Sequence, residues 1–134
     1  MMTGLMVLPS ELQAPVDDGA CQHLEGMSLP DIRLSNHSGQ LVNLSLLSGR
    51  SIVFVYPMTG HPDKPLPSGW DEIPGARGCT TEACGFSKNL ERFTALGYRI
   101  FGLSSQTHAE QQEAAARLQL SYPLLSDEKL MFAN

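Results

Sequence analysis

The amino-acid sequence predicts an α/β domain in which the strands of a parallel sheet alternate with helices. The continuous apolar run 52–56 is rich in β-branched and aromatic residues, as is typical of a buried strand, and the run 99–104 predicts a second buried strand. Each run precedes a segment with apolar residues at helical spacing, 83–96 and 107–120. A short apolar segment at 122–125 closes the series. This order predicts a βαβαβ core with right-handed crossovers.

The individual elements follow from local signals. The strand at 52–56 is expected to be buried on both faces, because its apolar residues are continuous and not alternating. Gly97 is a suitable residue for the end of the first helix, and Thr107 is an N-cap candidate for the second. From Asp127 onward we expect a further helix.

The chain before this core predicts an arm and a β-hairpin. Residues 1–23 carry proline, glycine and acidic residues without clear periodicity, which favours an extended arm over the surface. Segments 32–34 and 41–44 alternate apolar and polar residues on either side of turn-forming residues 36–39, as in a β-hairpin. We expect one domain over 24–134.

Composition narrows the function classes. The 134 residues include 9 basic and 14 acidic side chains, for a net charge of −5, and 42% are hydrophobic. An acidic chain of this kind is not expected to bind nucleic acid, and no apolar run approaches the roughly 20 residues that span a bilayer. The first basic residue is Arg33, so the N-terminus does not resemble a secretory signal, and we expect a cytoplasmic protein with reduced thiols.

A long proline- and glycine-rich loop separates the first strand of the core from the first helix. It runs from Gly60 to Gly78 and contains the only tryptophan, Trp70. Loops of this length inside a domain are usually functional or disordered. Two interpretations are open: surface decoration, or a lid that selects a substrate or partner.

Cys79 is the candidate nucleophile. It lies where the loop becomes a helix, directly after a predicted strand, and ligands of α/β sheets bind at this edge. The positive end of the helix dipole and Arg77, two residues earlier, both favour the thiolate form, which is the nucleophile. The alternative is that Cys79 is simply a small buried hydrophobic residue.

Cys84 follows five residues later and is the candidate partner thiol. In an intact helix the two Cα atoms are roughly 8–9 Å apart, whereas a disulfide needs less than about 7 Å. The pair can therefore bridge only if the first helical turn unwinds. Cys84 also fits a buried structural role, and Cys21, in the arm, has no assigned role. The four histidines are scattered and no zinc-type spacing is present, so we expect no metal.

At this point the sequence resembles the peroxiredoxins, most closely the bacterioferritin-comigratory or peroxiredoxin Q type. The residues that carry the resemblance are Val53-Phe54-Val55-Tyr56-Pro57, Gly78-Cys79-Thr80-Thr81-Glu82-Ala83-Cys84, the segment 96–105 and Tyr122-Pro123-Leu124-Leu125-Ser126-Asp127. The hairpin and the Leu44–Gly49 segment match the family's opening, and the resemblance covers roughly residue 24 to the end.

The resemblance implies a thioredoxin-like fold and a thiol peroxidase that reduces hydrogen peroxide or organic hydroperoxides. Cys79 would be oxidised to a sulfenic acid, and Cys84 would resolve it as an intramolecular disulfide. Thioredoxin or a glutaredoxin would reduce that disulfide by exchange. No bound cofactor is implied, because sulfur carries the electrons, and the oligomeric state is left open.

Two departures from the family pattern bear on these expectations. The family's loop reads Pro-x-x-x-Thr-x-x-Cys, but here its Thr position is Ala76 and its Pro position is Glu72. Pro57 and Thr59 occur about fifteen residues further upstream. We expect both to pack beside Cys79, with an insertion at about 61–75 bulging outward.

The second departure is the family's late arginine, for which this chain has no counterpart. We therefore expect the C-terminal strands to be missing, with Arg77 as the available cation. These departures motivate an alternative function, a non-catalytic redox sensor or interaction module on the same fold. A thiol-disulfide oxidoreductase acting on proteins is disfavoured, because the Cys-x-x-Cys spacing is absent.

Overall fold

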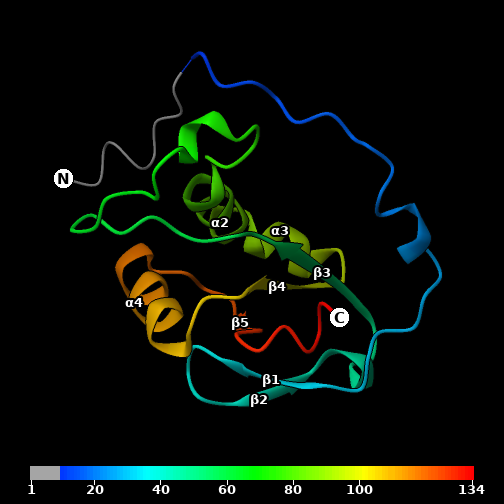
Figure 1. Cartoon of the computed structure of the whole chain (residues 1–134). Coiled ribbons are helices and arrows are strands. Elements are labelled where there is room, and N and C mark those ends of the chain that lie inside the picture. The colour runs from blue at the N-terminus through cyan, green and yellow to red at the C-terminus, as the bar shows by residue number, and fades with distance from the viewer. Residues whose placement is uncertain (1–9) are drawn as a thin grey trace.

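Five strands form one sheet in the computed structural model, which describes residues 10–134 (Figure 1). The strands are β1 (Arg33–Asn36), β2 (Leu41–Asn43), β3 (Arg50–Val55), β4 (Tyr98–Ser104) and β5 (Leu124–Ser126). Their order across the sheet is β2-β1-β5-β4-β3. β3, β4 and β5 are parallel, and β1 is antiparallel to both of its neighbours.

The helices are α2 (Cys79–Lys88), α3 (Leu90–Ala95) and α4 (His108–Leu118), with short 3-10 turns η1 (Gln22–Leu24), η2 (Leu44–Leu46) and η3 (Trp70–Glu72). The predicted βαβαβ core is confirmed as β3-α2-α3-β4-α4-β5, and the predicted hairpin is confirmed as β1-β2. Thr107 caps α4 as predicted: it accepts from the backbone N–H of Glu110, whose side chain accepts from Thr107 N–H in return.

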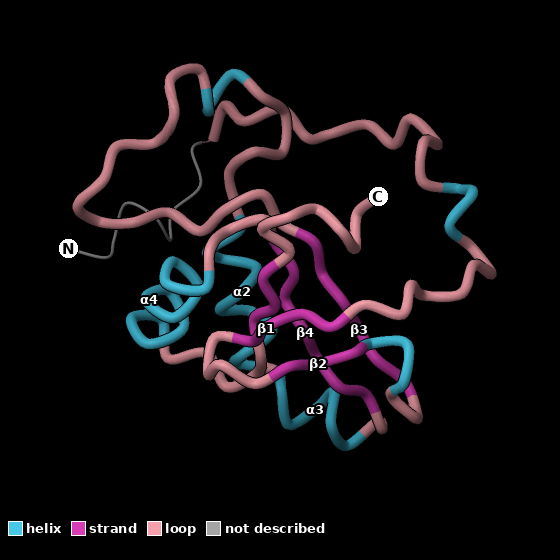
Figure 2. Tube along the Cα trace, turned by 60° about the horizontal axis from the view of Figure 1, so that its bottom comes forward, coloured by secondary structure: helices cyan, strands magenta, loops and turns pink. Residues whose placement is uncertain are grey.

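Two hydrophobic clusters lie on opposite faces of the sheet. The first packs α2, α3 and α4 against the sheet, and its buried members are Phe54, Tyr56, Cys79, Ala83, Ile100, Ala115, Tyr122 and Leu124. The second lies inside the curl of the hairpin, with buried members Leu34, Leu44, Phe101, Leu103 and Leu125. Figure 2 shows β1 and β2 crossing in front of β4 and β3, which is how the hairpin closes over this second cluster.

The expectation that the strand at 52–56 is buried on both faces is wrong. β3 is an edge strand that pairs only with β4, and Val55 is 73% exposed. Only one face of β3, which carries Phe54, packs against helices. A continuous apolar run does not by itself distinguish these two positions in a sheet.

The first helix is interrupted where the periodicity predicts a continuous one. Asn89 leaves the helical region, with φ −105° and ψ 8°, so that α2 ends at Lys88 and α3 starts at Leu90. Its side-chain Nδ2 donates to the carbonyl of Gly85 at 2.9 Å. Asparagine competes with the backbone for hydrogen bonds in this way, which explains the break.

The helix expected from Asp127 onward is not formed. The Asp127 carboxylate accepts hydrogen bonds from the backbone N–H groups of Phe132 and Ala133, both at 3.0 Å. Leu130 has a φ of 53°, which no continuing helix allows. The segment therefore folds back as successive turns around one carboxylate.

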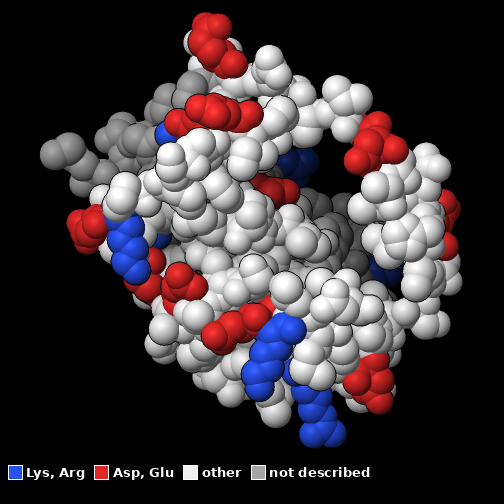
Figure 3. Space-filling view, viewed as in Figure 1, with Lys and Arg blue, Asp and Glu red and all other residues white. Residues whose placement is uncertain are grey.

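Residues 10–31 form an arm that runs around the body of the molecule in largely irregular conformation, and Cys21 is exposed within it (Figure 1). The first nine residues of the predicted arm lie outside the described part. On the face seen in Figure 3, acidic side chains are spread over the arm and the body, and basic ones are not gathered into one patch. No helix within residues 10–134 is long and apolar enough to cross a bilayer.

Candidate active site

Cys79 is the first residue of α2, as the sequence predicts, and its side chain is buried at 9% exposure. The preceding Gly78 has a φ of 117°, a conformation that favours glycine and lets the loop turn into the helix. The sulfur contacts the carbonyl oxygen of Ala76 at 3.7 Å. Cys79 belongs to the same core cluster as Phe54 and Tyr56, so the thiol faces into the protein.

The loop closes over the thiol. The cavity at Cys79 has a volume of about 20 Å³, enough for one water molecule but little more. It is lined by residues on both sides of the insertion and by residues from within it: Met58, Gly60, Leu66, Trp70, Ala76, Arg77, Gly78 and Thr80. Trp70 and Leu66 thus form part of the wall of the pocket beside the sulfur.

Burial raises the pKa of the Cys79 thiol above its ordinary value. Hydrogen bonding from the backbone of Met58 and of Cys79 itself lowers this pKa in part, and the charge of Glu82 raises it further. The sequence argument expected the helix dipole and Arg77 to favour the thiolate. In this closed arrangement desolvation outweighs them.

The Arg77 side chain is paired with the carboxylate of Asp71. Its Nε and one terminal nitrogen donate to the two carboxylate oxygens of Asp71 at 2.7 and 3.2 Å. Arg77 lines the cavity at Cys79, but its guanidinium is paired with the Asp71 carboxylate and not with the sulfur. The pair also fastens η3 to the residues just before α2.

Thr59 does not line the cavity at Cys79, contrary to the expectation. Its backbone N–H and its hydroxyl both lie near Oε1 of Gln106, at 3.2 and 3.4 Å. Its neighbours Met58 and Gly60 line the cavity instead. The chain therefore passes beside Cys79 as predicted, but the threonine side chain is turned away toward the half-buried side chain of Gln106.

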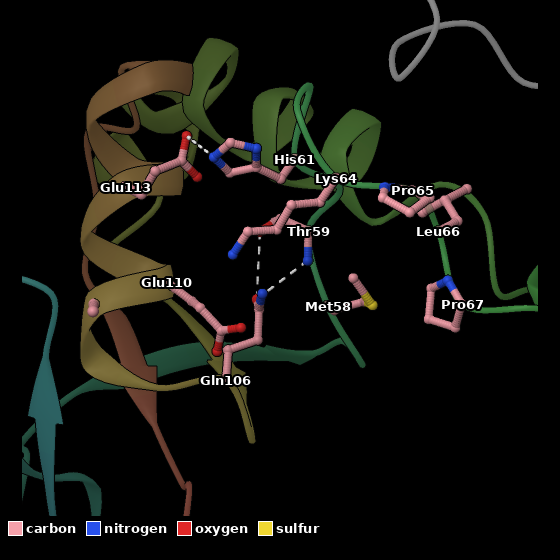
Figure 4. Close-up of a pocket in the computed structure, with 11 residues that line it drawn as sticks. Met58, Thr59, His61, Lys64, Pro65, Leu66, Pro67, Gln106, Glu110 and Glu113 are labelled. Atoms are coloured by element: carbon pink, nitrogen blue, oxygen red, sulfur yellow. Dashed lines mark hydrogen bonds and ion pairs between the residues drawn. The ribbon is translucent and has the colours of Figure 1, made fainter.

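The Thr59 side chain faces a second, larger pocket of about 280 Å³ between the loop and α4 (Figure 4). His61 lies 3.6 Å from Glu113 across one end of this pocket, and Arg117 donates to the carbonyl of Gly60 at 2.8 Å. In Figure 4, the side chains of 65–67 lie on the side of the pocket opposite α4, and the Lys64 side chain extends from the loop toward the helix. Met58 and Leu66 line both pockets and so separate this space from Cys79.

Cys84 is half-buried, five residues after Cys79 on the unbroken helix α2. Both thiols, and that of Cys21, are free. The hydroxyl of Tyr122 donates to the carbonyl oxygen of Ala83 at 2.6 Å, next to Cys84 in the chain. The structure therefore places both predicted cysteines on one helix in a reduced, helical arrangement.

Sequence reasoning missed the polar groups behind the site. Gln111 is fully buried on α4 and donates to Ser104 Oγ at 3.1 Å and to the Leu125 carbonyl at 2.6 Å. Tyr56 lies in the same core, and burial raises the pKa of its hydroxyl. A glutamine in the alanine-rich stripe of an amphipathic helix is the only sequence signal for this arrangement.

A βαβαβ sheet joined to an antiparallel hairpin, with a cysteine opening the first helix of the core, defines a thioredoxin-like protein with a thiol at its candidate site. Residues 73–134 match the model of the AhpC/TSA family. The chain is 32% identical over 105 residues to peroxiredoxin Q, chloroplastic, of Oryza sativa subsp. japonica and of Arabidopsis thaliana. The aligned part covers 78% of this chain and 42% of each relative.

Solved structures agree with this assignment. Peroxidoxin BcpB of Mycobacterium tuberculosis superimposes with a TM-score of 0.65 at 30% identity, over 81% of this chain and 62% of that protein. A peroxiredoxin Q structure from Xanthomonas campestris has a TM-score of 0.62 at 25% identity, over the same shares of the two chains. The family model, the curated relatives and the solved structures together support a peroxiredoxin Q and bacterioferritin-comigratory-protein type of family for this chain. It spans somewhat less than half the length of these curated relatives.

Proposed function

We propose that this chain carries the site of a thiol-dependent peroxidase with Cys79 as its nucleophile. The Cys79 thiolate attacks one oxygen of a hydroperoxide and the O–O bond breaks. Cys79 becomes a sulfenic acid, and the second oxygen leaves with a proton as water or an alcohol. Hydrogen peroxide and organic hydroperoxides are the proposed substrates.

Cys84 then completes the cycle. Its thiol condenses with the Cys79 sulfenic acid, forming the Cys79–Cys84 disulfide and releasing water. An external dithiol, for which we propose thioredoxin or a glutaredoxin, reduces this disulfide by two successive exchanges and is itself oxidised. We also propose a cytoplasmic location, although the plant relatives are chloroplastic by name.

One observation carries the proposal: the buried thiol at the start of α2 has a second thiol on the same helix, in a chain of this family. Hydrogen bonding from the backbone of Met58 and of Cys79 lowers the pKa of the Cys79 thiol in part, which favours the anionic form. The pocket beside the sulfur has a volume of about 20 Å³, so we expect the residues that line it to move apart when a hydroperoxide approaches.

Single-turnover stopped flow with hydrogen peroxide tests the proposal. The reduced protein is expected to consume one equivalent of hydrogen peroxide per chain and to lose two thiols. In Cys79→Ser, the remaining Cys84 thiol is not expected to react with peroxide at a comparable rate. Cys21→Ser is the matched control, because Cys21 is exposed on the arm and has no role in the cycle. The assignment fails if Cys79→Ser reacts as fast as the parent.

A second candidate function is a non-catalytic redox sensor on the same fold. The raised pKa of Cys79, the closed cavity and the pairing of Arg77 with Asp71 favour slow oxidation over rapid turnover. A sensor forms the Cys79–Cys84 disulfide under oxidant but does not turn over with thioredoxin and its reductase. Sustained peroxide consumption in that coupled assay eliminates the sensor.

A further inference from the structure

The hydroxyl of Tyr122 makes a contact that the reaction above does not use. Tyr122 is 4% exposed and donates to the carbonyl oxygen of Ala83 at 2.6 Å, across 39 positions of sequence. Burial raises the pKa of this hydroxyl, so it stays protonated and remains a donor throughout the working pH range. The acceptor lies in α2, between the two cysteines.

This contact acts directly on Cys84. The carbonyl of Ala83 and the backbone N–H of Cys84 belong to the same planar peptide group. A hydrogen bond to that oxygen therefore restrains the rotation that Cys84 needs in order to leave the helix and approach Cys79. The intact helix keeps the two Cα atoms roughly 8–9 Å apart, beyond the span of a disulfide.

Tyr122 is itself held rigidly. Its ring packs edge-on against Phe54 and Phe86, with centroid distances of 5.7 and 6.5 Å. The adjacent Ser121 adds a second fastening one turn further along α2, where its backbone N–H donates to Ser87 Oγ at 3.1 Å and the two hydroxyls lie 3.2 Å apart. The turn before β5 thus holds α2 on both sides of Cys84.

We propose that Tyr122 is a positioning residue that holds Cys84 in the helix and sets the rate at which it resolves the Cys79 sulfenic acid. This inference rests on the proposed function. While Cys84 is held, a second hydroperoxide competes: it oxidises the sulfenic acid to a sulfinic acid and leaves as water or an alcohol. The Tyr122 hydroxyl therefore determines how readily excess peroxide inactivates the site.

The test compares Tyr122→Phe with the parent after one equivalent of hydrogen peroxide. A timed alkylation quench measures disulfide formation. Loss of one neutral hydrogen bond predicts formation about five- to tenfold faster, with less sulfinic acid at a given excess of peroxide. Tyr56→Phe removes another buried hydroxyl from the same aromatic cluster, one with no hydrogen-bond partner on α2, and it serves as the control for the hydrogen-exchange readout.

Hydrogen exchange provides a readout that is independent of peroxide. In the reduced protein, Tyr122→Phe is expected to speed exchange of the amides at 80–85 by a similar factor, and Tyr56→Phe to leave them unchanged relative to the rest of the helix. Ser87→Ala, which removes the second fastening, is expected to give a smaller effect in the same direction. If Tyr122→Phe does not fold, Ser87→Ala provides the variant on which the restraint of α2 is tested.

The outcomes separate this inference from the proposed function. If the parent forms no Cys79–Cys84 disulfide, the proposed function fails, whereas the exchange result still tests the restraint. If the parent forms the disulfide and Tyr122→Phe forms it no faster, the positioning role is overturned. A lower melting temperature with unchanged disulfide and exchange rates shows a purely structural hydroxyl and also overturns it.

Discussion

The two cysteines of α2 are held in opposite ways. The sulfur of Cys79 is buried and lies 3.7 Å from the carbonyl oxygen of Ala76, and the loop enters the helix through Gly78. Cys84 is half-buried, but its peptide group is fastened at 2.6 Å by Tyr122. Burial of a thiol and restraint of its backbone are therefore separate properties. We therefore expect the reaction of Cys79 to be limited by access of peroxide to its sulfur, and the reaction of Cys84 to be limited by opening of the helix.

The largest effect is expected from removing each thiol in turn. Cys79→Ser lowers the rate of reaction with peroxide by at least about a thousandfold, because the nucleophile is gone. Cys84→Ser leaves that first step unchanged and abolishes disulfide formation, so that the sulfenic acid persists. Stopped-flow peroxide kinetics with trapping of the sulfenic acid by a dimedone-type reagent measures both. Equal behaviour of the two variants contradicts the division of roles.

The pH dependence of the first step tests the burial of Cys79. Because burial raises its pKa, only a small fraction is thiolate near neutral pH, and that fraction grows as pH rises toward the pKa. In the Cys84→Ser variant the rate constant is therefore expected to increase with pH from about pH 7 upward, by up to about tenfold per pH unit while the pH lies well below the pKa. A plateau below pH 7 shows that the loop opens far enough to rehydrate the sulfur.

The core beneath α2 has no room for a side chain at Gly102 of β4. A Cβ on Gly102 of β4 lies 2.6 Å from Leu124 Cδ2 and 2.9 Å from Phe54 Cζ. Gly102→Ala is expected to destabilise the fold by about 1–3 kcal/mol in urea unfolding, because both neighbours belong to the core cluster.

Gly85→Ala is the matched substitution. Gly85 lies in α2 beside Cys84, and a Cβ there meets no atom within 4 Å. Alanine in this helix interior is expected to stabilise by about 0.5–1 kcal/mol and to slow disulfide formation. If Gly85→Ala instead lowers the stability of the fold, position 85 is subject to a constraint other than the free space around its Cα atom.

An effect similar in size to that of Gly85→Ala, but confined to stability, is expected at α4, away from both cysteines. Thr107→Ala removes the capping box with Glu110 and costs about 1 kcal/mol of stability. Chemical denaturation measures this loss, and Thr107→Ser restores most of it. Disulfide formation at Cys79 stays unchanged, and a slower rate in Thr107→Ala shows that α4 also controls the opening of α2.

Local and periodic signals predicted most of the framework. The strands at β3 and β4, the Thr107 cap and the position of Cys79 at the start of a helix all follow from neighbours close in sequence. The break at Asn89 and the turns around Asp127 were missed, because side-chain hydrogen bonds to the backbone override apolar spacing there. The edge position of β3 depends on strand order, which its own residues do not encode.

The site was predicted less completely, for a physical reason. Cys79 and Cys84 were found because reactive sulfur has a distinctive residue type and spacing. The orientation of Thr59 toward Gln106 and the contact of Tyr122 with Ala83 each join residues about 40 or more positions apart. Such contacts exist only after the sheet forms. The pKa of Cys79 likewise depends on the depth at which the loop buries it.

Mass analysis of the peroxide-treated protein tests the central claim most directly. Trypsin cuts after Arg77 and Lys88, so both cysteines fall in the single peptide 78–88, and Cys21 falls in another. After one equivalent of peroxide, alkylation and non-reducing digestion, the account predicts peptide 78–88 two hydrogens lighter and unalkylated, with Cys21 alkylated. Peptide 78–88 carrying a sulfinic acid on Cys79 and an alkylated Cys84, or cross-linked to Cys21, contradicts it.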